Sequence, residues 1–420
     1  MQISIIKTIV NWRMLVIFCL GISSGIPLLV TGSTLQAWMT DEKVDLAVIG
    51  MFSLVGFPYT VKFLWAPALD RYVPPFFGRR RGWMLTSQFL LMISIGAFYF
   101  VRPAESPWIV AFLALLVSFF SASQDVVVDA YRRELLRDEE LGLGSSFAVN
   151  GYRIGMLISG AFALFLADQI SWNFVYLLLA ASLFIGIITT LLGPDSEGHI
   201  IPPQSLHEAV IKPFTDYFRR RGAIEILAFL ILYKIGDIMA ATMTVPFILK
   251  IGFTKTDLAV IAKTFGILAT IAGGLIGGIL LIRLGIYKSL WIFGALQAIS
   301  TLSFSALSSV GACYSLLVSI ITFENLTSGM GISAFTAFMA SLCNKRFTAT
   351  QYALFSSFMG IPRVIISSPT GYLAEYLGWG YFFIVCTLAA IPGLAFLFRY
   401  KAWQEESYPL NPDIMHQRIL

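Results

Sequence analysis

Two carboxylates follow a long apolar run in the first half of the chain. The run from Ile109 to Gln124 has no charged residue; Asp125 comes directly after it, and Asp129 follows after three valines. An apolar run of this length predicts a membrane-spanning helix. A carboxylate inside such a helix costs about 2.5–3.5 kcal/mol on insertion scales. We therefore expect each of these carboxylates to have either a function or a partner.

On a helix, Asp125 and Asp129 lie one turn apart, with Ser121 one turn before them and Arg132 nearly one turn after. These four side chains form one polar stripe, which has to face protein or a water-filled cavity. Because a low-dielectric site disfavours the charged form of a carboxyl group, Asp125 could bind and release a proton during transport. The alternative is a structural ion pair with Arg132, or with Arg153 on the next span. This alternative is favoured for Asp129.

The composition is that of a polytopic membrane protein. The chain has 420 residues, of which 57% are hydrophobic and 13% are charged, and its mean hydropathy is +0.78. The basic residues that give the net charge of +5 lie mainly in short loops, so they do not indicate nucleic-acid binding. The four scattered cysteines form no CxxC pair, so neither a disulfide framework nor a zinc site is supported.

About twelve spans are predicted, in two bundles of six helices. The first bundle occupies residues 1–192, a linker occupies 193–222, the second bundle occupies 223–400 and a tail occupies 401–420. Lys and Arg residues concentrate in the termini and the even-numbered loops, which predicts that both termini, the linker and the tail are cytoplasmic. The expected spans lie near 14–38, 46–69, 82–101, 107–130, 145–168, 172–192, 223–249, 256–282, 288–307, 311–341, 350–373 and 379–399.

A basic loop follows the second span of each half, which is the layout of the major facilitator superfamily. Such transporters bind substrate near the membrane midplane between two halves that rock around it. The loop after the second span predicts a conformational latch whose charges pair with helix ends in one state and separate in another. Positive-inside topology alone would also produce most of this loop. The latch residues are Asp70, Arg71, Arg79, Arg80 and Arg81.

Other polar residues within spans are candidates for substrate contacts. Gln36 and Trp38 would suit a sugar, although Trp38 would also fit an interfacial tryptophan belt. Lys234 could bind a substrate carboxylate, or it could pair with Asp237 three residues later. Glu324, within a later span, is a further candidate for proton coupling.

Several segments resemble the AmpG family of muropeptide permeases of the Gram-negative inner membrane. The resemblance covers most of the chain and rests on GIPLLVTGSTLQAWM (25–39), GFPYTVKFLWAPALDRYVPPFFGRRRGW (56–83), FFSASQDVVVDAYRREL (119–135), NGYRIGMLISG (150–160), ILYKIGDIMAATM (231–243) and AKTFGILATIAGGLIGG (262–278). It implies uptake of N-acetylglucosaminyl-1,6-anhydro-N-acetylmuramyl peptides, driven by the proton gradient. It also implies a role in peptidoglycan recycling and a link to β-lactamase induction.

A muropeptide has sugars, amides and carboxylates, so its site needs hydroxyl, amide, aromatic and cationic partners. The candidates are Gln36, Trp38, Gln124, Tyr152, Arg153, Tyr233, Lys234, Asp237 and Lys263. Beyond the lipid bilayer and protons we expect no cofactor, no metal and no nucleic acid, and we expect a monomer. Two alternatives stay open: the same fold carrying acetyl-CoA or a sugar phosphate, and a membrane enzyme acting on lipid-linked sugars. Short basic loops and isolated histidines argue against the enzyme.

Overall fold

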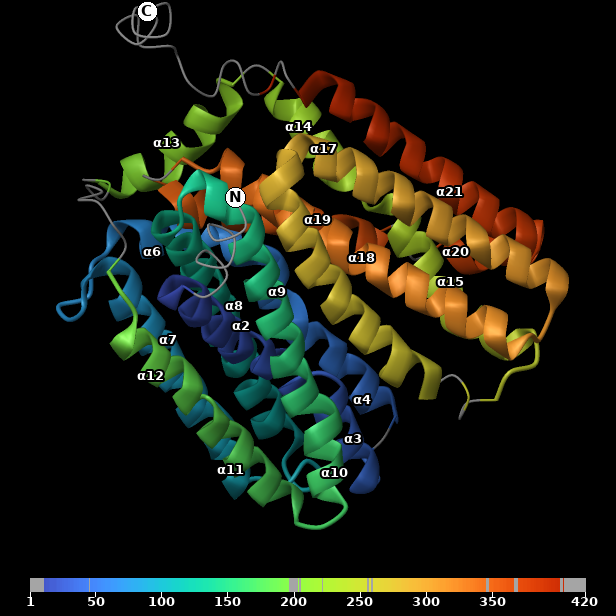
Figure 1. Ribbon diagram of the computed structural model, residues 1–420. Helices are drawn as coiled ribbons and strands as arrows, with labels where there is room; N and C mark the ends of the chain where they lie inside the picture. The colour runs from blue at the N-terminus through green and yellow to red at the C-terminus, as the bar shows by residue number, and fades with distance from the viewer. Residues whose placement is uncertain are drawn as a thin grey trace, which may run out of the picture. The chain divides into compact units, whose positions relative to one another are not determined.

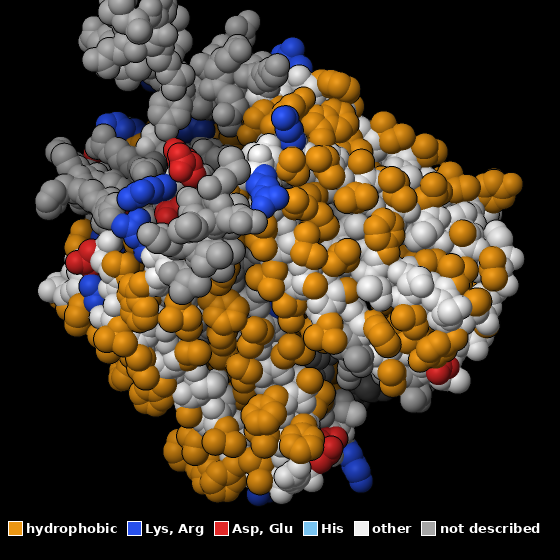
Figure 2. Space-filling model, in the orientation of Figure 1, with side chains coloured by type: hydrophobic (Ala, Val, Ile, Leu, Met, Phe, Trp, Pro, Cys, Tyr) orange, Lys and Arg blue, Asp and Glu red, His pale blue; other side chains and the backbone are white. Residues whose placement is uncertain are grey.

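The computed structural model describes residues 11–44, 46–195, 203, 205–220, 222–254, 257, 260–344, 347–365, 369–400 and 403. Throughout these residues the regular structure is helical, without any strand (Figure 1). This agrees with the predicted all-α membrane protein. Apolar side chains are spread over the described part of the face seen in Figure 2. Exposed examples include Phe100 and Tyr376. An apolar exterior of this extent fits a lipid environment better than water.

The chain divides into two compact units. Unit 1 contains residues 1–209 and 339–357, and unit 2 contains residues 210–338 and 358–420. The boundary between Ala209 and Val210 lies inside the predicted linker 193–222. Unit 1 also contains residues 339–357, whereas the predicted bundles are each consecutive in the sequence.

Unit 1 is built from the helices of the first half of the chain. Their bounds are α2 (Trp12–Val30), α3 (Ser33–Asp41), α4 (Leu46–Met51), η1 (Phe52–Gly56), α5 (Phe57–Val61), η2 (Lys62–Leu64), α6 (Ala66–Arg71), α7 (Gly78–Gly96), η3 (Ala97–Phe100), α8 (Pro107–Leu135), η4 (Asp138–Glu140), α9 (Leu141–Leu157), η5 (Ile158–Phe162), α10 (Ala163–Ala167), α11 (Trp172–Ser182) and α12 (Phe184–Leu192).

Unit 2 contains most of the remaining helices, and three of the elements below cross a unit boundary. The elements are α13 (Leu206–Phe218), α14 (Ala223–Leu232), α15 (Ile235–Lys250), η6 (Ile261–Gly266), α17 (Ile267–Val310), α18 (Tyr314–Leu342), α19 (Thr348–Ile365), α20 (Thr370–Leu377), α21 (Trp379–Phe396) and η8 (Leu397–Arg399). The end of α18 and the start of α19 belong to unit 1, as does the start of α13.

Nine helices in the described part of the chain are long and apolar enough to cross a membrane. One of them, α17, holds two of the predicted spans, joined by a kink at Gly285 where φ is 73°. The predicted span 46–69 consists instead of the short elements α4 to α6, with prolines in the first turns of α5 and α6. Proline lacks the backbone donor that a continuous helix needs, so breaks at these positions are expected.

Glycines allow close contact between helix backbones in each unit. A Cβ on Gly25 of α2 would fall on the backbone of Tyr152 in α9, and one on Gly273 of α17 would fall on the backbone of Leu326 in α18. Small residues at such crossings let helices approach closely within a membrane.

The variant Gly25→Ala should destabilise unit 1 by about 1–3 kcal/mol, because the added methyl group overpacks the crossing of α2 and α9. The measurement is the fraction of detergent-solubilised protein that stays monodisperse after heating. Gly56→Ala is the matched control, since a Cβ there meets no atom within 4 Å. Equal losses in the two variants would contradict the role of the crossing.

Candidate functional site

The predicted polar stripe lies on α8 and faces the interior of unit 1. Ser121 and Gln124 are buried, and Asp125 and Asp129 are partly buried. The Gln124 amide donates to the hydroxyls of Ser23 and Ser24 on α2, at 3.1 and 3.3 Å. The stripe is therefore anchored to the first helix of the same unit.

Asp125 lies at the centre of a polar cluster. The hydroxyl of Ser24 donates to its carboxylate, and Lys62 and Asp129 lie close enough to interact with it electrostatically. Tyr59 and Ser121 also lie near it. The cluster thus combines a carboxyl group that can change its charge with a cation and several hydroxyls, which is what a proton-binding site requires.

Lys62 is the one cation that the structure adds to the predicted residues of this cluster. Near a predicted helix end, its side chain could have extended to the membrane surface. The structure places it in η2, where it is 7% exposed and close to both Asp125 and Asp129. The second span is broken into short helices at this point. The Lys62 side chain therefore has a different direction from the one that a single continuous helix would give it.

Asp129 forms the ion pair with Arg132 that was the alternative to a proton site, at 2.9 Å. Arg132 also donates to the Tyr352 hydroxyl at 2.8 Å, and its guanidinium lies 5.4 Å from the centre of that ring. Arg132 is 4% exposed and Tyr352 is 3% exposed. Asp129 is thus held by a buried cation, which leaves Asp125 the better candidate for reversible protonation.

Gln124 Oε1 in this cluster is buried and has no hydrogen-bond partner among the described residues. Buried polar groups are normally paired with protein or water, so this atom is a place where water or a polar cargo would bind.

The predicted sugar contacts are in different environments. Gln36 is exposed on α3, whereas Trp38 is 1% exposed and stacks on Trp172 with 6.2 Å between ring centroids. The Trp38 indole donates to Glu42 at 2.9 Å. Tyr152 and Arg153 are partly buried on α9. An indole packed in this way belongs to the apolar core of unit 1, and its face is not available as a platform for a sugar.

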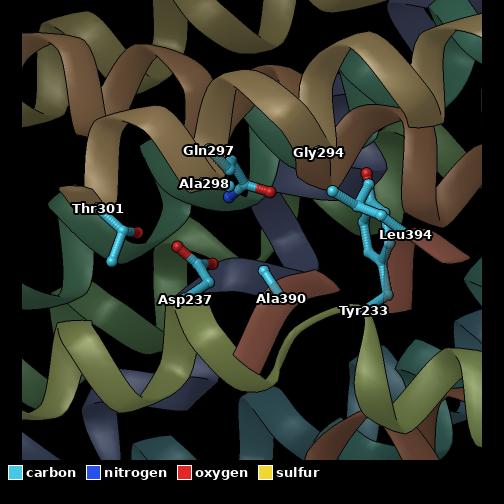
Figure 3. A pocket seen from close by; sticks show the side chains of 8 residues that line it. All are labelled: Tyr233, Asp237, Gly294, Gln297, Ala298, Thr301, Ala390 and Leu394. Carbon is cyan, nitrogen blue, oxygen red and sulfur yellow. The ribbon is translucent and has the colours of Figure 1, made fainter. Parts of the chain in front are cut away.

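In unit 2, Lys234 and Asp237 form the predicted ion pair at 3.2 Å. Lys234 lies at the break between α14 and α15 and also donates to Gln297 Oε1 at 3.2 Å. Asp237 and Gln297 come from different helices and line one small pocket (Figure 3). Gln297 Nε2 is buried and has no hydrogen-bond partner in the part of the chain that the structure describes. A polar site at a broken helix is typical of substrate and ion sites in transporters.

The remaining predicted contacts of unit 2 are placed as follows. Tyr233 is 5% exposed, donates to the Leu290 carbonyl at 2.8 Å and stacks on Phe335, which indicates a packing role. Glu324 accepts from Asn325 Nδ2 at 3.0 Å. The backbone of Lys263 is in the π-helix η6, but its side chain lies outside the described residues.

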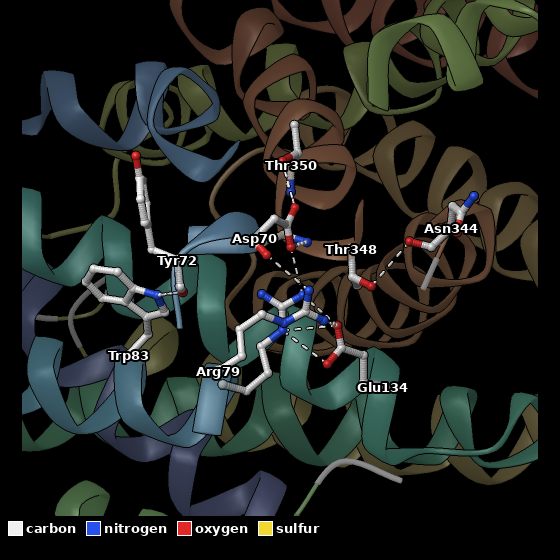
Figure 4. A network of polar contacts seen from close by, with 10 residues as sticks. Asp70, Tyr72, Arg79, Trp83, Glu134, Asn344, Thr348 and Thr350 are labelled. Carbon is white, nitrogen blue, oxygen red and sulfur yellow. Dashed lines mark hydrogen bonds and ion pairs between the residues drawn. The ribbon is translucent and has the colours of Figure 1, made fainter. Parts of the chain in front are cut away.

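The predicted latch residues Asp70 and Arg80 meet in a buried network (Figure 4). Arg80 lies between Asp70 and Glu134, at 2.8 and 2.6 Å, and all three residues are at most 3% exposed. Asp70 also accepts from the backbone amides of Ala349 and Thr350 at the start of α19, at 3.3 and 2.9 Å. A carboxylate there caps the helix and interacts favourably with its dipole.

The other three arginines of the latch prediction have separate contacts. Arg79 donates to the Asp70 carbonyl and to Glu134, so it extends the network. Arg81 donates to carbonyls at the end of α12, and Arg71 lies over the Tyr72 ring. The sequence analysis did not single out Glu134. It lies at the end of a span close to Arg132, Arg133 and Arg137, and this run of charges could have indicated a network.

Comparisons with known proteins address the family directly. The family model of the Major Facilitator Superfamily matches residues 13–367. Two solved structures share the fold. The proton:xylose symporter XylE has a TM-score of 0.69 and 12% sequence identity, and the match covers 93% of this chain and 95% of that chain. The Escherichia coli fucose:proton symporter FucP has a TM-score of 0.67 and 16% sequence identity, and the match covers 94% of this chain and 98% of that chain.

Curated relatives are similar over nearly the whole chain. The anhydromuropeptide permease of Escherichia coli K12 is 46% identical over 92% of this chain and 79% of its own length. A transporter of Rickettsia conorii that carries the AmpG name is 35% identical over 94% of this chain and 97% of its own length. The transporter prediction is therefore confirmed over the enzyme alternative. The chain belongs to the major facilitator superfamily and, within it, to the AmpG family of permeases.

Proposed function

We propose that this protein imports anhydromuropeptides across the bacterial inner membrane for peptidoglycan recycling. The cargo would be the disaccharide N-acetylglucosaminyl-1,6-anhydro-N-acetylmuramic acid, with or without its peptide. The single observation that carries the proposal is the 46% identity to a permease of that name over 92% of the chain. The buried hydroxyl, amide and cationic groups of the two units are of the kinds that such a cargo requires.

We propose further that the import is coupled to protons through Asp125. The Ser24 hydroxyl and the Lys62 ammonium group lie beside the Asp125 carboxyl group, where they can stabilise the carboxylate after its proton leaves. The basic loops favour cytoplasmic termini, and entry from the periplasm then follows the proton gradient inward.

Uptake by cells that lack their own muropeptide permease tests the proposal. The chain is expressed in them, and labelled disaccharide and disaccharide-peptide are followed with and without a protonophore. Uptake that the protonophore abolishes is expected. Absence of uptake by well-inserted protein would refute the cargo and favour another anionic solute, such as acetyl-CoA or a sugar phosphate.

The pair Lys234 and Asp237 gives a separate prediction about cargo binding. Lys234→Gln should destabilise unit 2 by about 3 kcal/mol, because it leaves the Asp237 carboxylate without its cation. The double variant with Asp237→Asn should recover this stability, since neither charge remains. If Lys234 also binds a cargo carboxylate, the double variant should still bind the disaccharide about tenfold more weakly.

The control for this prediction is the same disaccharide with its carboxylate methylated. Its affinity should be equal for wild type and the double variant. Thermal unfolding separates the structural effect from the binding effect. Full recovery of both stability and disaccharide affinity in the double variant would assign Lys234 a structural role only.

A further inference from the structure

The helix α13 carries an apolar stripe that is exposed with respect to the described residues. This helix (Leu206–Phe218) lies within the predicted linker 193–222 and is labelled in Figure 1. Val210, Ile211 and Phe218 are 40%, 43% and 52% exposed, and Phe214 is half-buried between them. Residues three, four and seven or eight positions apart share one face of a helix, so these four side chains form one continuous surface.

The opposite flank of the same helix is fixed to the protein. Ala209 and Tyr217 are fully buried, and Pro213 is buried between them. The Tyr217 hydroxyl donates to the carbonyl of Ala223, the first residue of α14, at 2.8 Å. Gly222 makes the turn between the two helices with φ at +81°. The stripe is thus held at a defined angle to α14.

The position of α13 indicates what its stripe contacts. Phe218 is the last residue of α13, and α14 begins a membrane span only five residues later. Ile224, in the first turn of that span, is 76% exposed. A helix whose end is tied to the start of a span lies at the boundary between the membrane and water.

Basic side chains flank the stripe. Lys212 and Arg219 are exposed, and Arg220 pairs with Asp216 at 3.4 Å. Helices that lie in the plane of a membrane surface combine an apolar face with lysine and arginine beside it. Anionic phospholipids of the cytoplasmic leaflet attract such residues.

We propose that α13 is an interfacial helix that binds anionic phospholipid. Val210, Ile211, Phe214 and Phe218 enter the boundary between head groups and acyl chains, while Lys212 and Arg219 contact the head-group phosphates. This inference uses the proposed cytoplasmic location of the linker and is independent of the identity of the cargo.

Spin labels on α13 test the membrane contact. The full chain, with its four cysteines replaced by serine, receives a single cysteine at Ile211, Phe218 or Lys212. Each variant is labelled with a nitroxide and reconstituted into phosphatidylcholine vesicles with or without 30% phosphatidylglycerol. Labels at 211 and 218 should be reached by oxygen more than by an aqueous nickel chelate, and the label at 212 should show the reverse.

Two charge variants test the head-group contact. With the label at 218, phosphatidylglycerol should increase the membrane-bound fraction of α13, and Arg219→Gln together with Lys212→Gln should remove this increase. The expected change in the binding equilibrium is about fivefold for each basic residue. Arg102→Gln is the control, because Arg102 is exposed in a different loop and pairs with Glu105.

Three results would overturn the inference. Labels at 211 and 218 that the nickel chelate reaches as easily as the label at 212 would mean that the stripe faces water. Labels that neither reagent reaches would mean that a second copy of the chain or another protein covers it. Burial of the labels without any effect of phosphatidylglycerol would refute the head-group contact.

Discussion

Asp125→Asn should abolish accumulation of cargo against its gradient while the protein stays folded and inserted. Asparagine has nearly the same shape and can still accept from Ser24, so the cluster around residue 125 keeps its packing. It cannot bind or release a proton, however. If one proton is coupled to each cargo molecule, a gradient of one pH unit supports about tenfold accumulation, and the variant should support none.

The measurement compares two activities of the same reconstituted vesicles. Accumulation driven by an imposed pH gradient should be lost, whereas exchange of labelled for unlabelled cargo should persist, because exchange needs no net proton movement. Asp129→Asn is the matched control on the same helix. This variant breaks the ion pair with Arg132, so it should lower the stability of the protein. Its accumulation driven by the pH gradient should be affected less.

Normal accumulation by Asp125→Asn would contradict the assignment. If Glu324→Gln lost accumulation instead, the proton site would lie in unit 2. The two carboxylates are in different settings. Glu324 accepts from the neighbouring Asn325 amide, and Asp125 has a buried lysine beside it.

Sequence spacing predicted those features that depend on a single helix. The four residues of the α8 stripe, the pairing of Asp129 with Arg132 and the pairing of Lys234 with Asp237 all follow from the helical period. The fold class follows from apolar length and from the loop charges. These properties are local, so one sequence is enough to derive them.

Contacts between elements distant in the chain could not be derived in this way. Lys62 reaches Asp125 because the second span is broken, and Asp70 reaches the start of α19 across about 280 residues. Trp38 looked suitable for a sugar because its neighbours are polar, yet its ring is in an aromatic cluster. The face that a side chain presents depends on packing between helices, which the helical period alone leaves open.

The buried network at Asp70 gives the second large expected effect. Asp70→Asn removes the charge that pairs with Arg80 and that caps α19, and breaking a buried pair on one side costs about 3–5 kcal/mol. We propose that this loss releases residues 339–357 from the rest of unit 1. Transport should fall, because one conformation loses the contacts that stabilise it.

Cys343 provides a direct readout of that release. Its thiol is 5% exposed, donates to the Met339 carbonyl and lies in the segment that Asp70 holds, so it should be protected in the wild type. In Asp70→Asn its reaction with a membrane-permeant maleimide, followed by mass spectrometry of the peptide, should accelerate by about 100-fold or more, since a loss of about 3–5 kcal/mol is at least two factors of ten at 1.4 kcal/mol each. Cys386, buried in unit 2, should stay unreactive in the same sample and serves as the internal control.

Thr350→Val grades this effect. It removes the hydroxyl that donates to Asp70 at 2.7 Å and keeps both backbone amides, so the loss should be about 1 kcal/mol, or about fivefold in the labelling rate. If the labelling rate rises and transport falls in the order wild type, Thr350→Val, Asp70→Asn, the cap on α19 contributes to the transport cycle. Unchanged protection of Cys343 in Asp70→Asn would show that packing, and not the carboxylate, holds the segment in place.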